Sequence, residues 1–210
     1  MGYRDRYQEY RQVGQQLNTN ILQAYSDNEL ILNSAESLGI DHNGVDIQYD
    51  YQSDMAVHFE FMLYEYCRES QTAAEQYLEE ERWDTDIQRT ILEATLEAET
   101  SVFEITTVDE SADRLELTDL RTGDDEVSIV DINLSHTAEP GVLLFVRPVQ
   151  YEEFTITSGV SFPFPADKKA NLLDECERQE EYTDARSASR QRFITFYELY
   201  RDHGIRMQYN

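Results

Sequence analysis

The spacing of hydrophobic residues changes from helical to strand-like near residue 100 and returns to helical spacing near residue 163. Before residue 100, apolar residues recur three and four positions apart, as on one face of a helix. Between Val102 and Val149, short apolar segments are separated by turns such as Pro140-Gly141. This pattern predicts an α+β protein. It would have a helical N-terminal half, a small five-stranded antiparallel barrel of the SH3-like or OB-like kind, and C-terminal helices that pack back on it.

The pattern also predicts how the chain is divided. We expect a helical region over residues 1–99, the small β-barrel over 100–162 and the C-terminal helices over 163–210. A chain of 210 residues suits one domain of ordinary size or two small ones. We expect the three parts to form one compact unit.

The first helix is expected over residues 4–25, and it carries a seam of apolar residues with heptad spacing. The seam includes Tyr7, Tyr10, Leu17 and Ile21. Two interpretations are open: the seam packs on the rest of the same chain, or it forms a homodimer. Three heptads are short for a self-standing coiled coil, which favours packing within the chain.

Several local signals predict where the other elements begin and end. Ser26 and Glu29 have the spacing of a capping box. A change of phase after Ile129 predicts a β-bulge or a sharp bend, and residues 162–165, Phe-Pro-Phe-Pro, predict an extended connector. A helix that begins near Ser53 should bury one apolar face, made of Met55, Phe59, Met62, Leu63, Tyr66 and Cys67.

Charge is the most distinctive feature of the composition. The chain has 43 Asp and Glu against 17 Lys and Arg, a net charge of −26, and only two lysines, Lys168 and Lys169. In about 1 M salt the Debye length falls to about 3 Å, so repulsion among these acids is screened. The composition resembles that of proteins from the salt-loaded cytoplasm of halophilic archaea. An acidic surface for one basic partner is the alternative, but the acids are spread over the whole chain.

The common nucleotide-binding, hydrolase and metal-binding motifs are absent from the sequence, so no cofactor is expected. One group of residues could carry chemistry. Asp54, His58 and Glu65 lie at i, i+4 and i+11, so they could hold a divalent metal or make His58 a general base. The alternative, which we favour, is that Asp54 is a helix N-terminal acid and His58 a half-buried polar residue.

Arginines near the C-terminus are a second candidate site. Arg186, Arg190, Arg192 and Arg201, followed by Arg206, are interleaved with aromatic residues of the last helix. Arginine with aromatic residues is typical of single-strand nucleic-acid binding. Nearby acids and the negative charge of the whole protein oppose a polyanion. We therefore favour a core role for the aromatics and ion pairs for the arginines.

The N-terminus is polar and no apolar run is long enough to cross a bilayer, so we expect a cytoplasmic protein without a membrane partner. Cys67 and Cys176 are expected to be reduced. The function that fits best is a non-enzymatic binding or adaptor protein with an unidentified protein partner. Its contact surfaces would be the barrel rim and exposed aromatic helix faces. A nucleic-acid-associated protein and an enzyme that uses His58 with Asp54 are the alternatives.

Overall fold

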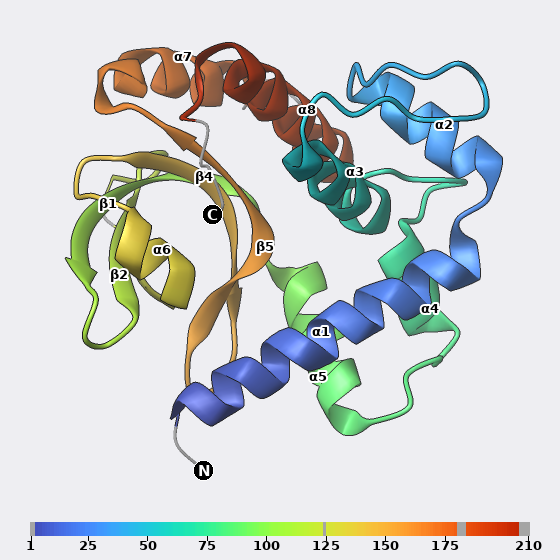
Figure 1. Ribbon diagram of the computed structural model, residues 1–210, viewed down its shortest axis with the longest axis horizontal. Coiled ribbons are helices and arrows are strands. Elements are labelled where there is room, and N and C mark those ends of the chain that lie inside the picture. The colour runs from blue at the N-terminus through green and yellow to red at the C-terminus, as the bar shows by residue number, and fades with distance from the viewer. Residues whose placement is uncertain (1–2, 124, 180–183, 206–210) are drawn as a thin grey trace. The chain divides into compact units, whose positions relative to one another are not determined.

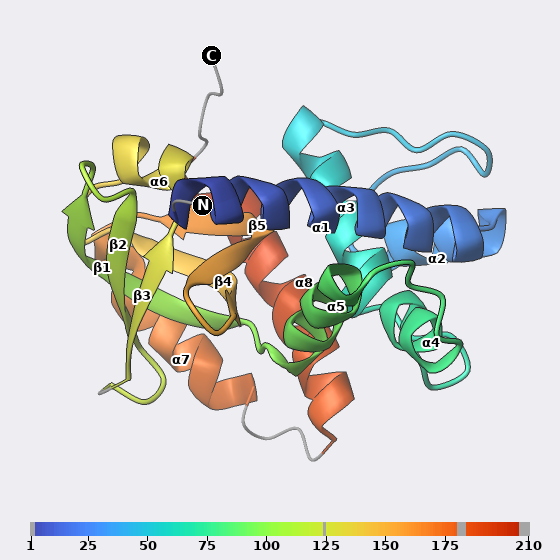
Figure 2. The same ribbon diagram turned by 90° about the horizontal axis from the view of Figure 1, so that it is seen from below.

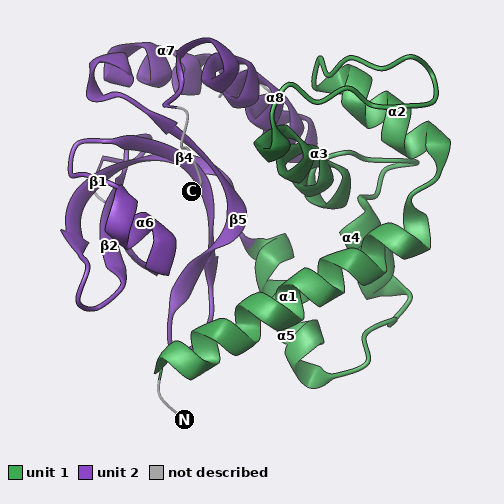
Figure 3. Cartoon of the chain, viewed as in Figure 1, with its two compact units in different colours: residues 1–97 green, residues 98–210 purple. Residues whose placement is uncertain are grey.

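A computed structural model describes residues 3–123, 125–179 and 184–205, and it confirms the α+β class (Figure 1). The chain forms two compact units, residues 1–97 and residues 98–210 (Figure 3). The first unit is helical and the second holds the whole sheet.

The first unit contains five helices among its described residues. Its helices are α1 (Tyr3–Tyr25), α2 (Asn28–Ser37), α3 (Gln52–Tyr64), α4 (Ala73–Glu79) and α5 (Asp86–Glu97). Polar residues cap the N-termini of several of these helices. At the start of α4, the Thr72 hydroxyl accepts from the N–H of Glu75, and the Glu75 carboxylate accepts from the N–H of Thr72. This reciprocal pair is a capping box, so the start of α4 is set by local sequence.

The apolar seam of α1 lies inside the protein. Leu17 and Ile21 are fully buried and Tyr7 is nearly so, whereas Tyr10 is half-buried. Within the first unit α1 packs against α3, α4 and α5, and it runs beside α5 in both views (Figures 1 and 2). Leu17 and Ile21 of the seam therefore pack on the chain itself.

In the residues that the structure describes, the second unit forms five strands and four helical segments. The strands are β1 (Ser101–Asp109), β2 (Arg114–Asp119), β3 (Glu126–Val130), β4 (Leu143–Gln150) and β5 (Thr155–Phe164). The helices are α6 (Ile132–Thr137), the 3-10 helix η1 (Ala166–Lys168), α7 (Lys169–Gln179) and α8 (Ala185–His203). Thr122 and Gly123 lie in the turn that follows β2, and Asp124 lies outside the described residues.

The strands pair in the order β1-β2-β3-β5-β4, and β4 returns to pair with β1. All neighbours are antiparallel except β3 and β5, which run parallel and meet at the single pair Ile129 and Thr155. The prediction of a wholly antiparallel sheet is therefore wrong. The reason is topological: strand directions cannot alternate all the way around a closed ring of five, so one pair must be parallel.

The change of phase after Ile129 is the end of a strand and the start of a helix. β3 ends at Val130, and Asp131 caps α6 by accepting from the N–H groups of Asn133 and Leu134. Its second carboxylate oxygen accepts from the Thr157 hydroxyl at 3.2 Å. Of the two predicted alternatives, a β-bulge or a sharp bend, the bulge is not found in β3: the chain leaves the strand after Val130 and turns into α6. The turn forms here because an aspartate satisfies the free N–H groups of a helix N-terminus.

The aromatic residues of α8 belong to the core of the second unit. Phe193, Phe196, Tyr197 and Tyr200 are all buried. Phe145 on β4 stacks on Phe196 with ring centroids 4.6 Å apart. These aromatic side chains therefore have the core role that we favoured for them. Residues 162–164, predicted as part of a connector, belong to β5 instead, and the carbonyl of Pro163 accepts from the N–H of Ile205.

Candidate functional site

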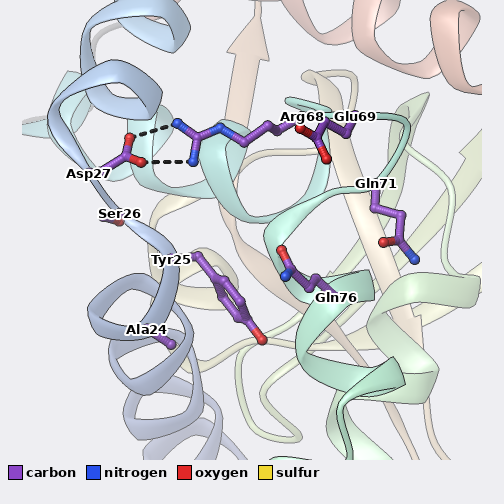
Figure 4. Close-up of a pocket in the computed structure, with 8 residues that line it drawn as sticks. All are labelled: Ala24, Tyr25, Ser26, Asp27, Arg68, Glu69, Gln71 and Gln76. Atoms are coloured by element: carbon purple, nitrogen blue, oxygen red, sulfur yellow. Dashed lines mark hydrogen bonds and ion pairs between the residues drawn. The ribbon is translucent and has the colours of Figure 1, made fainter.

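A polar pocket of about 390 Å³ lies in the first unit, beside the end of α1. Its walls come from the end of α1, the connection from α1 to α2, the connection from α3 to α4, and α4 (Figure 4). The lining residues are Ala24, Tyr25, Ser26, Asp27, Arg68, Glu69, Gln71 and Gln76. The pocket thus joins segments more than 40 residues apart in the sequence.

An ion pair between Asp27 and Arg68 connects two of these walls. Both guanidinium Nη atoms donate to the Asp27 carboxylate at 2.8 Å, so the contact is bidentate (Figure 4). The Asp27 carboxylate also accepts from the N–H of Leu30 and caps α2. The pKa of Asp27 is lowered to about 2, mainly by the hydrogen bonds from the Arg68 guanidinium and to a smaller extent by the N–H of Leu30. Asp27, and not the predicted Ser26, is therefore the N-cap of α2.

We expect Asp27→Ala to lower the free energy of unfolding by about 1 kcal/mol, because a helix cap is lost. The exposed ion pair adds at most about 1 kcal/mol, and salt screens it. Ser26→Ala is the matched control and should change stability by less than about 0.5 kcal/mol. Urea unfolding followed by Trp83 fluorescence measures both variants. A larger loss in Ser26→Ala would contradict the observed cap.

Tyr25 lines the pocket and contacts two charged side chains. Its hydroxyl donates to Glu80 at 2.8 Å, and the Arg82 guanidinium carbon lies 5.6 Å from its ring centroid. Burial and the hydrogen bond to Glu80 raise the pKa of Tyr25. Gln76 also donates to Glu80. Tyr25 and Gln76 thus both donate hydrogen bonds to Glu80, which holds α1 and α4 together at the pocket wall.

The wall of the pocket includes the hydroxyl group of Ser26. Its oxygen is buried and has no hydrogen-bond partner among the described residues. Glu69 and Ser70 form the adjacent turn with positive φ angles of 51° and 85°, a conformation that is strained for residues other than glycine. The polar lining of the pocket suits a small polar molecule.

His58 is completely buried and joins two hydroxyl groups. Nε2 lies 2.7 Å from Ser34 Oγ and Nδ1 lies 2.8 Å from the Tyr49 hydroxyl. Ser34 Oγ donates to the carbonyl of Leu30 at 2.6 Å, so its lone pair is left to accept from Nε2–H. Nδ1 then accepts from Tyr49. In this arrangement each of the three hydrogen bonds has one donor and one acceptor while His58 is neutral. Burial lowers the pKa of His58 to about 4.

The structure does not join Asp54 and Glu65 to His58. One carboxylate oxygen of Asp54 accepts from the N–H of Tyr51 at 3.1 Å, at the start of α3. The other is buried and has no hydrogen-bond partner in the described part of the chain. Glu65 is the buried C-cap of the same helix. In the part of the chain that the structure describes, no three His, Cys, Asp or Glu side chains are placed to hold a metal ion. The hydrogen bond of Asp54 caps the start of α3, and those of His58 connect α3 to Ser34 and Tyr49.

The C-terminal arginines do not share one role. Arg192 is half-buried and donates to the carbonyl of Thr100 at 2.8 Å, which fastens the chain just before β1. Arg201 is exposed, with its guanidinium carbon 5.9 Å from the ring centroid of Tyr197. Arg186 is exposed and Arg190 half-buried, and both have interactions within the protein. Arg206 lies outside the described residues.

One exposed helix face differs from the acidic surface expected of this chain. We call it the α3 face and define it by the exposed residues of α3 and its N-cap, which are Tyr51, Gln52, Met55, Ala56 and Phe59. None of them is charged. Tyr51, Met55 and Phe59 are 53%, 39% and 38% exposed. Met55 and Phe59 lie four residues apart on one ridge of the helix, and Tyr51 is its N-cap.

The sequence assigned Met55 and Phe59 to the buried face of this helix, and that assignment is wrong. Val57, Phe61 and Met62 fill the core instead. A signal was present: the apolar residues of this segment are spread around the helix and do not form one face. A helix of that kind is normally covered all round, so the exposed α3 face is the unexpected feature.

Two further observations concern the whole described chain. None of its helices is long and apolar enough to cross a membrane. Cys67 and Cys176 are both free thiols, as predicted.

Comparison with known proteins gives a family but no activity. No curated protein and no solved structure is significantly similar to the chain. One family model, described as "Family of unknown function (DUF7986)", matches residues 1–210. Because this match covers the full length of the sequence, the chain belongs to the family of unknown function DUF7986.

Proposed function

We propose that this protein is a non-enzymatic binding protein of a salt-rich cytoplasm and that it binds a protein partner through the α3 face. The observation that carries the proposal is the exposure of Tyr51, Met55 and Phe59 on a chain of net charge −26. Exposed apolar residues grouped on one surface are typical of interaction sites. A partner that covered them would contribute about 1 kcal/mol for each side chain at these exposures.

The buried polar groups favour binding over catalysis. His58 has no exposed surface, and both its nitrogens lie within hydrogen-bond distance of Ser34 and Tyr49. A general base must reach a substrate proton directly or through one water molecule. This geometry supports a structural role for His58 and a non-enzymatic function for the protein.

The second unit is proposed to be the scaffold of this protein. Its closed order of five strands would be a small barrel of the SH3-like or OB-like kind. The buried aromatic residues of α8 pack on β4 and β5. This packing supports a rigid core in which α8 is committed to the fold.

The proposed function is tested by cross-linking from the α3 face. A photoreactive phenylalanine analogue replaces Phe59 in the full chain, expressed in its native cells. We expect one discrete cross-linked species, identified by mass spectrometry, because the α3 face is then covered by its partner. Met55→Glu, placed four residues away, should remove that species. The same analogue at Gln15, an exposed position of α1, is the control and should give none. No discrete species from position 59 would overturn the proposal.

Salt dependence tests the proposed environment. We expect the midpoint of thermal unfolding to rise as potassium chloride is increased toward about 1 M, because salt at that level reduces the Debye length to about 3 Å and screens the repulsion among the acids. Circular dichroism at several salt concentrations measures this change. A midpoint that is highest at low salt would contradict a salt-rich environment.

A further inference from the structure

We propose that the pocket beside the end of α1 binds a small linear polyamine, an aliphatic chain that carries two or three ammonium groups. All the lining residues belong to the first unit and none belongs to the α3 face, so the inference goes beyond the proposed function. The pocket has a volume of about 390 Å³, which is in the range of small-molecule sites. A whole polyamine of this kind fits it.

Three side chains of the pocket wall direct their hydrogen-bond donors at acids. The Tyr25 hydroxyl and the amide nitrogen of Gln76 both donate to Glu80, and the amide nitrogen of Gln71 donates to Glu79. The amide oxygens of Gln71 and Gln76 are left as acceptors. A ligand that brings its own N–H donors suits this wall. An anion or a sugar needs donors from the wall and suits it less.

Glu69 adds a negative charge to the pocket that no described residue pairs with. Its side chain is exposed and makes no hydrogen bond or ion pair in the described part of the chain. The positive φ angles of Glu69 and Ser70 are those of a type I′ turn, which asparagine and glycine form most readily. Strain of this kind is common where a ligand is held. In Figure 4 the side chains of Glu69 and Gln76 point toward the space beside Tyr25.

The charge around the pocket favours a ligand with more than one positive charge. The Arg68 guanidinium is neutralised by its bidentate contact with Asp27, and Glu29 lies 3.7 Å from it. Among the described residues, the charged groups that line the pocket or contact its wall are Asp27, Glu29, Glu69, Glu79, Glu80, Arg68 and Arg82. The acids of this set outnumber the arginines by three, so the ammonium groups of a polyamine match the excess.

The positions of the acids favour an organic cation over a metal ion. Within residues 3–123, 125–179 and 184–205, no three His, Cys, Asp or Glu side chains are placed to hold a metal ion. A magnesium or calcium ion needs its oxygen ligands within about 2.0–2.6 Å of one point. The ammonium groups of a polyamine are spaced along a flexible chain, so they reach acceptors that lie apart from one another.

Titration calorimetry of the full chain with spermidine tests the inference. It is done in about 1 M potassium chloride, which screens the general attraction of a polycation to the acidic surface. We expect one site with a Kd on the order of 100 µM. Glu69→Gln should weaken binding about tenfold, because a charge-assisted hydrogen bond is lost. Glu36→Gln, at an exposed position of α2 outside the pocket, is its matched control and should change the Kd less than about twofold.

A second pair of variants leaves the net charge of the chain unchanged. Gln76→Met removes an acceptor from the pocket wall and should weaken binding about fivefold. Gln15→Met makes the same change at an exposed position of α1 and should bind spermidine as the wild type does. A loss confined to Gln76→Met cannot come from the charge of the whole protein, so it identifies the pocket as the site.

Two other probes decide the class of ligand. N-acetyl-lysine methylamide carries one ammonium group and should bind at least about tenfold more weakly than spermidine. Magnesium chloride should displace spermidine no better than potassium chloride of the same ionic strength. Equal affinity for the lysine compound, or displacement by magnesium at lower ionic strength, would overturn the assignment of a polyamine. No binding of spermidine, or the same affinity in the wild type and all four variants, would overturn the site itself. None of these outcomes affects the cross-linking expected from the α3 face.

Discussion

Phe145→Ala should lower the free energy of unfolding by about 3–5 kcal/mol, the largest effect expected from a single substitution in this protein. Phe145 is 2% exposed. Its ring stacks on Phe196 at 4.6 Å and on Phe162 at 5.5 Å, with interplanar angles of 9° and 7°. Removing the ring leaves a cavity between β4, β5 and α8 and ends both stacked contacts. Chemical unfolding followed by far-UV circular dichroism measures the loss.

Phe59→Ala is the matched control because it makes the same chemical change on the α3 face. Phe59 is 38% exposed, so the loss should be under about 1 kcal/mol. Comparable losses in the two variants would contradict the division between a buried aromatic core on α8 and an exposed apolar face on α3.

His58 should make the first unit less stable in mild acid. Burial lowers its pKa in the folded chain to about 4, below the ordinary value of 6.5. As the pH falls from 6.5 to 4, the unfolded chain takes up a proton at this position and the folded chain does not. The stabilisation by neutral His58 is therefore complete above pH 6.5 and is lost on the way to pH 4. The pKa difference corresponds to at most about 3 kcal/mol.

The measurement compares the wild type with His58→Gln, which has no titrating group at this position. The unfolding free energy is followed by Trp83 fluorescence at constant salt between about pH 4 and pH 7. The difference between the two proteins should favour the wild type most at the higher pH and shrink in acid. Protonation of the 43 acids affects both proteins alike and largely cancels. A difference that stays constant with pH would show that His58 does not titrate as expected.

Local sequence was sufficient for much of the fold. The helical spacing up to residue 97, the turn signals and the alternating apolar segments after Val102 gave the right class of structure and five strands. These features depend on contacts between residues close in the chain, which propensity and periodicity describe well. The capping box at Thr72 and Glu75 formed in the same way.

Contacts between distant segments decided what local patterns could not. Asp27 replaced Ser26 as the cap of α2, and its carboxylate also pairs with Arg68, 41 residues away. The chemistry of His58 was likewise set by Ser34 and Tyr49, from a different helix and a loop. No spacing rule connects His58 with these two residues, so the sequence suggested its near neighbour Asp54 instead.

The sequence by itself determined an acidic α+β protein with helices before a five-stranded sheet, because composition and periodicity are properties of the chain alone. The tertiary structure decided the parallel pair of β3 and β5, because it arises only when the ring of strands closes. It also decided which side of α3 remains exposed. An apolar helix can bury any of its faces, and only the packing of Val57, Phe61 and Met62 in the core leaves Met55 and Phe59 at the surface.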